Sequence, residues 1–93
     1  MSATAASVVG ENDIEVQAER TLRNVEAILV AGGSSLSQLL SVTIYIKGRA
    51  LWPTVNTVYA RIMGDARPAR ATIPVPEIRE GCLIEIQAIG AIG

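Results

Sequence analysis

The 93-residue sequence contains no histidine, no phenylalanine and a single cysteine, Cys82. Without histidine, acid–base chemistry falls to carboxylates, tyrosine, lysine or water, and neither a Ser–His nor a Cys–His nucleophile pair can form. One cysteine excludes an intramolecular disulfide and fits a reducing compartment. The Cys and His spacings of zinc sites are missing, so we expect no metal site. We interpret Cys82 as a small buried hydrophobic residue in a strand.

An excess of charge of one sign is also missing. Eight Lys and Arg against nine Asp and Glu give a formal net charge of −1, and the basic residues are dispersed. Such a chain has no positive electrostatic potential that would attract phosphates, which argues against a nucleic-acid partner. No apolar run approaches the roughly 20 residues that span a bilayer, and the first seven residues do not resemble a secretory signal. We therefore expect a cytoplasmic protein with no membrane partner.

The composition indicates a globular chain. Apolar residues make up 49% of it and charged residues 18%, and the length corresponds to one domain over residues 1–93. With only three aromatic residues, the core has to be built from Ile, Val, Leu and Ala. Small aliphatic chains often complete their burial by oligomerising, so we expect a subunit of an oligomer.

The pattern predicts two helices and three strands. Asn12 and Glu15 have the spacing of a capping box before a helix over residues 13–31, which Gly32 and Gly33 end. Alternation predicts a strand over 41–47, and Pro53 opens a helix that runs to residue 63. Strands follow over 69–75, where Pro74 favours an edge position or the end of a strand, and over 82–92. Residues 1–11 are interpreted as a tail or a marginal strand.

This element order predicts an α+β fold with both helices packed on one face of a sheet. The strand at 41–47 and the strand at 69–75 are expected to pair in parallel across the helix between them.

Two charged residues lie outside the solvated helix faces. Arg70 begins a strand between two alanines, where a guanidinium can bind a carboxylate in bidentate fashion, although a structural ion pair is the simpler interpretation. Glu85 lies within an apolar strand, either on a solvated face or in a pocket with a partner. Asn56, early in the second predicted helix, either caps that helix or lines a cleft.

The segment Arg67-Pro68-Ala69-Arg70-Ala71-Thr72-Ile73-Pro74-Val75 resembles a motif of the Rid family, the reactive intermediate (imine) deaminases, also called YjgF-type proteins or endoribonuclease L-PSP. The flanking segments are similar to the family's helices and strands in the same order, from Asp13 to Ile89. They are residues 13–17, 22–29, 42–46, 55–60 and 83–89.

The resemblance implies a chorismate-mutase-like fold and a homotrimer with clefts between neighbouring subunits. It implies hydrolysis of enamine or imine intermediates of the 2-aminoacrylate type to a 2-keto acid and ammonia, without a cofactor. By similarity, Arg70 holds the substrate carboxylate and Glu85 positions and polarises the attacking water. Thr72 and Asn56 are expected to line the cleft.

The sequence departs from the family pattern at its amino terminus. Family members carry a hairpin before the first helix that supplies a Tyr and a Ser-Gly segment to the pocket, whereas only residues 1–12 precede the helix here. We expect a sheet about two strands smaller, with an edge that is exposed or is covered by residues 2–9, a partner subunit or further sequence. This departure favours an alternative function, a non-catalytic trimeric module that binds a small carboxylate. RNA cleavage, suggested by the family's older name, has little support from the near-neutral charge.

Overall fold

The computed structural model of the chain describes residues 1–7 and 13–92. Its strands are β1 (Ser2–Ala6), β2 (Leu39–Ile46), β3 (Ala69–Pro74) and β4 (Ile84–Gly90). Its helices are α1 (Ile14–Ala31) and α2 (Trp52–Met63), with short 3₁₀ turns at Leu36–Gln38 (η1) and Arg49–Leu51 (η2).

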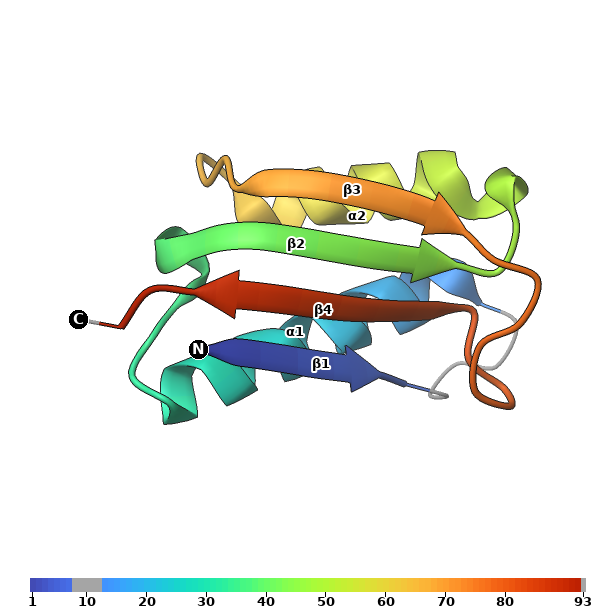
Figure 1. Cartoon of the computed structure of the whole chain (residues 1–93). Helices are drawn as coiled ribbons and strands as arrows, with labels where there is room; N and C mark the ends of the chain where they lie inside the picture. The colour runs from blue at the N-terminus through green and yellow to red at the C-terminus, as the bar shows by residue number, and fades with distance from the viewer. Residues whose placement is uncertain (8–12, 93) are drawn as a thin grey trace.

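The four strands form one sheet in the order β1-β4-β2-β3, and both helices cover the same face of it (Figure 1). β4 runs antiparallel to β1 and β2, and β2 pairs in parallel with β3 across α2. The predicted α+β arrangement and the parallel crossover are confirmed. β3 is an edge strand, as Pro74 indicated, because a residue without an amide hydrogen is tolerated there.

The core lies between the sheet and the helices and is aliphatic, as the composition predicted. Alternate residues of β2 and β4 point toward the helices and meet one stripe of each helix. The most deeply buried large side chains of this core are those of Leu22, Val25, Leu29, Val42, Ile44, Ile46, Val58, Ile84 and Ile86. Cys82 is buried with a free thiol, which confirms its interpretation as a small buried residue, but it lies just before β4 rather than in a strand.

Helix α1 has the predicted extent, and Asp13 is its N-cap. The Asp13 carboxylate accepts a hydrogen bond of 3.2 Å from the amide of Val16, which satisfies one of the free donors of the first turn. The predicted capping residue Asn12 lies outside the described residues. At the other end Gly33 adopts a φ of 89°, a conformation that glycine adopts without steric cost.

The last strand is shorter than the predicted 82–92. The amide of Cys82 bonds to the carbonyl of Arg79 in a turn, and the amide of Leu83 bonds to the side chain of Gln17. At the other end the amide of Ala91 bonds to the carbonyl of Gln38. These groups are engaged outside the strand ladder, so β4 covers only Ile84–Gly90.

The expected marginal strand at the amino terminus is present as β1, which pairs with β4 along its whole length. The sheet edge next to β4 is therefore covered by residues 2–6, within the range that the sequence suggested. Neither helix of the described part is long and apolar enough to cross a membrane.

Candidate functional site

Arg70 lies on the helix-covered side of β3. Its partner in the ladder is Val42, which is buried beneath the helices, and paired residues of neighbouring strands point to the same face. Because the crossover places α2 beside β3, the Arg70 side chain reaches that helix. Its guanidinium carbon lies 4.6 Å from the centre of the Tyr59 ring, within the range of a cation–π contact.

A pocket of about 380 Å³ opens between α2 and β3, and we call it the α2–β3 pocket. Asn56 lines it together with Tyr59, Arg67 and Arg70. Arg67 is held at the mouth by hydrogen bonds from its guanidinium to the carbonyls of Gly64 (2.6 Å) and Ala66 (3.0 Å). Two arginines and no carboxylate line the pocket, which makes it suitable for a small anion such as a carboxylate.

Tyr59 is a member of this pocket that the sequence patterns did not identify. It belongs to the apolar stripe of α2 and is 91% buried, with a hydroxyl that has no hydrogen-bond partner among the described residues. Burial raises its pKa above the ordinary value of 10.0, and the charges of Arg70 and Arg67 oppose that rise. Tyr59 therefore stays protonated at neutral pH and presents an uncharged ring to the Arg70 guanidinium.

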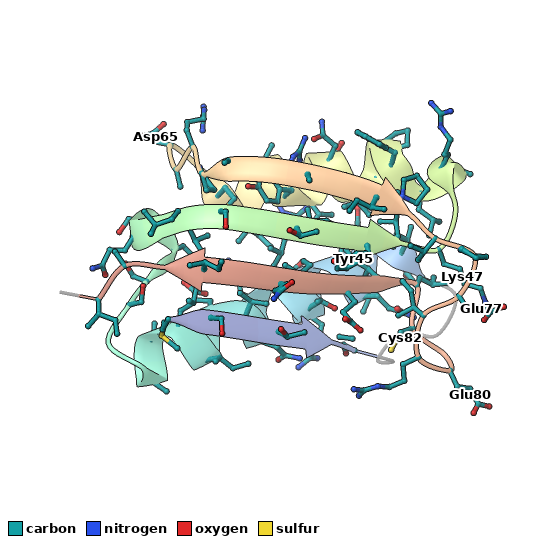
Figure 2. The ribbon with its side chains drawn as sticks, viewed as in Figure 1. Tyr45, Lys47, Asp65, Glu77, Glu80 and Cys82 are labelled. Atoms are coloured by element: carbon teal, nitrogen blue, oxygen red, sulfur yellow. The ribbon has the colours of Figure 1, made fainter. Side chains whose placement is uncertain are left out.

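Glu85 lies on the opposite, uncovered side of the sheet. It pairs with Tyr45 of β2 and Ala6 of β1, and its side chain is half-buried. A second pocket of about 410 Å³ lies over this face, and we call it the sheet-face pocket. Figure 2 shows Tyr45 on this face of the sheet. The lining residues are Thr4, Tyr45, Val75, Glu77, Ile78, Glu85 and Gln87.

Arg70 and Glu85 therefore do not share a cleft within one chain. Val42 and Ala88 are paired and buried beneath the helices, whereas Glu85 lies three residues before Ala88 and points to the other face. The two pockets have no lining residue in common. One chain therefore has two pockets of similar volume. Arginine side chains line one of them, and carboxylate side chains line the other.

Thr72 lies two residues after Arg70 and faces the same side of the sheet, paired with Ile44. It is half-buried and lines neither the α2–β3 pocket nor the sheet-face pocket. Within one chain Thr72 lines neither pocket, and its place in a cleft between subunits stays a prediction.

In residues 1–7 and 13–92, no group of three or more Cys, Asp or Glu side chains is placed to hold a metal ion. The chemistry available to the two pockets is that of guanidinium, carboxylate, amide and hydroxyl groups.

Comparison with known proteins places these features in a family. The model of the family described as endoribonuclease L-PSP matches residues 2–92. The chain is 39% identical over 79 residues to a RutC family protein of Pyrococcus horikoshii, covering 85% of this chain and 63% of that relative. It is 34% identical over 79 residues to the chloroplastic Reactive Intermediate Deaminase A of Arabidopsis thaliana, covering 85% and 42% respectively.

Among solved structures, Escherichia coli TdcF with bound serine superposes with a TM-score of 0.88 at 28% identity, covering 98% of this chain and 78% of that one. The chain is a member of the endoribonuclease L-PSP family, the Rid/YjgF-type proteins. It spans less than two thirds of the length of the Pyrococcus relative.

Proposed function

We propose that this protein hydrolyses reactive enamine and imine intermediates of the 2-aminoacrylate type to 2-keto acids and ammonia, as a homotrimer whose sites lie between subunits. The observation that carries the proposal is the placement of Arg70 and Glu85 on opposite faces of one sheet, each in its own pocket. A site that uses both residues needs the α2–β3 pocket of one copy against the sheet-face pocket of another. The name of the Arabidopsis relative supports the reaction class.

In this account Arg70 binds the substrate carboxylate through two parallel N–H···O bonds, and Arg67 adds positive charge at the same pocket. Asn56 lines the wall of that pocket and offers an amide to the bound substrate. Thr72 faces the same side of β3 as Arg70 and completes the wall when the neighbouring copy closes the cleft.

The Glu85 carboxylate acts as the general base. The enamine first takes a proton from solvent at its β carbon, which gives the iminium form of the imine. Glu85 then accepts a proton from a water molecule as the water oxygen bonds to the imine carbon, which gives a carbinolamine. Glu85 returns this proton to the nitrogen, the C–N bond breaks and ammonia leaves, and the hydroxyl group releases its proton to solvent as the C=O bond forms. The imine is already electrophilic, so orientation and a polarised water supply the required rate enhancement and no cofactor takes part.

The test measures pyruvate release from 2-aminoacrylate generated freshly by a pyridoxal-phosphate dehydratase, with the spontaneous rate subtracted. We expect Arg70→Ala and Glu85→Gln each to lower kcat/KM by about 100-fold or more. Arg23→Ala is the matched control, because Arg23 is exposed on α1 and lines neither pocket. Equal rates for the wild type and both site variants would contradict the assignment.

The second candidate is a non-catalytic trimeric module that binds a small carboxylate. The α2–β3 pocket favours it, because its two arginines and its lack of acidic residues suit a carboxylate whether or not turnover follows. This candidate predicts that pyruvate or serine raises the melting temperature of the wild type but not of Arg70→Ala, with no acceleration of imine hydrolysis. Acceleration that depends on both Arg70 and Glu85 would exclude it.

A further inference from the structure

The sheet-face pocket contains a second carboxylate, which the proposed hydrolysis does not use. Glu77 lies in the connection between β3 and β4, is exposed, and lines the same pocket as Glu85. Figure 2 shows Glu77 at the end of the sheet where β4 begins. Glu80, a few residues further along the same connection, points away from the sheet and does not line this pocket.

The charge of this pocket is entirely negative. Glu77 and Glu85 are its only charged lining residues, and neither forms an ion pair within 4 Å in the described part of the chain. Lys47 lies at the same end of the sheet but is not a lining residue. The remaining wall includes the apolar side chains of Val75 and Ile78, beside which a hydrocarbon stem can pack while its polar end stays in water.

The direction in which a substrate lies in the site follows from the proposed function, on which this inference rests. Arg70 of one copy binds the substrate carboxylate, and Glu85 of the other addresses the imine carbon. With Glu85 at the imine carbon, the substituent that distinguishes one 2-imino acid from another lies within the sheet-face pocket, of which Val75, Glu77 and Ile78 form one wall. A negative substituent meets the Glu77 carboxylate there, whereas a positive one pairs with it.

We propose that Glu77 is a specificity-determining residue that selects 2-imino acids with neutral or positively charged side chains and rejects those with a second carboxylate. The pocket is open to water, so the discrimination is moderate, on the order of tenfold in kcat/KM between basic and acidic imino acids. Because the interaction is electrostatic and exposed, it weakens at high salt.

The test generates 2-imino acids in place with amino-acid oxidases and catalase, from lysine or arginine, from leucine, and from glutamate. The rate of 2-keto acid formation is measured in competition with semicarbazide. The wild type is expected to favour the basic and neutral substrates over the acidic one. Glu77→Gln should lower the ratio of basic to acidic kcat/KM by about tenfold, and Glu77→Lys should reverse the preference. Glu80→Gln is the matched control and should leave the ratio unchanged.

The outcomes separate this inference from the proposed function. If the wild type hydrolyses imines in an Arg70-dependent way but Glu77→Gln and Glu77→Lys keep its substrate ratio, the role of Glu77 is overturned and the proposed function stands. If the wild type accelerates none of these reactions, the proposed function fails and the role of Glu77 fails with it. A ratio that changes equally in Glu80→Gln would also overturn the inference, because any surface charge would then produce the effect.

Discussion

Tyr59 and Arg70 form the contact on which the α2–β3 pocket, with its two arginines, depends. The ring lies 4.6 Å beneath the guanidinium carbon and limits the directions that an exposed arginine side chain can take. Substitution Tyr59→Phe keeps the ring and removes a buried hydroxyl that has no partner among the described residues. We expect imine hydrolysis to be unchanged in Tyr59→Phe, whereas Tyr59→Leu raises KM about threefold because Arg70 loses its support.

The wild type and Tyr59→Phe also test the role of the hydroxyl through their free energies of unfolding. At pH 7, Tyr59→Phe should match the wild type or exceed its free energy of unfolding by up to about 1 kcal/mol, since an unpaired buried hydroxyl is costly. The pKa of Tyr59 is raised in the native state, so the unfolded chain releases this proton first as the pH rises through 10.0. The wild type therefore loses stability above that pH more steeply than Tyr59→Phe. Urea unfolding at pH 7 and pH 10.5 measures both effects, and a large loss at pH 7 in Tyr59→Phe would contradict the account.

Sequence patterns singled out Arg70, Glu85 and Asn56 as candidates but not Tyr59 or Glu77, for a physical reason. Tyr59 belongs to an apolar helical stripe, and only the placement of α2 beside β3 brings it under Arg70. Glu77 lies in a connection without periodicity, so its approach to the pocket of Glu85 depends on tertiary structure. Which face the helices cover depends on the pairing of β2, β3 and β4, which no single strand determines.

At the scale of elements, Gln17 joins α1 to the start of β4. Its buried side-chain amide donates to the carbonyl of Gly81 (3.0 Å) and accepts from the amide of Leu83 (2.8 Å), two residues before Glu85. The sequence pattern predicted helix α1 well, because its cap and its apolar stripe depend on residues that are close together in the chain. The predicted start of the strand at 82–92 was wrong because the amide of Leu83 bonds to a side chain more than 60 residues away.

Removing the Gln17 side chain takes away the hydrogen-bond partner of two part-buried backbone groups, the carbonyl of Gly81 and the amide of Leu83. We expect Gln17→Ala to lower the free energy of unfolding by about 3 kcal/mol, and Arg20→Ala, exposed on the same helix, to change it by less than about 0.5 kcal/mol. Thermal and urea unfolding measure both. A loss below about 1 kcal/mol in Gln17→Ala would show that the turn at 81–83 is held by other contacts.

At the scale of the whole molecule, one face of the sheet has no helix over it (Figure 1). This face carries Glu85 and small or polar residues such as Ser41 and Thr43, and it exposes Ile73 and Ile89 by 41% and 44%. Exposed aliphatic residues beside half of a candidate site suit packing against another copy. If another copy packs on this face, the same contact buries the face and completes the site. We therefore expect a trimer with a mass of about 29 kDa in solution, three times 9.8 kDa.

The most direct measurement of the central claim, a site shared between copies, mixes the two inactive variants. Arg70→Ala and Glu85→Gln are coexpressed with different tags, and oligomers that carry both tags are compared with each variant alone. If each site of a trimer takes Arg70 from one subunit and Glu85 from its neighbour, every trimer that carries both tags has one intact site out of three and restores about a third of the wild-type imine hydrolysis. Mixed oligomers as inactive as either variant alone would contradict a shared site.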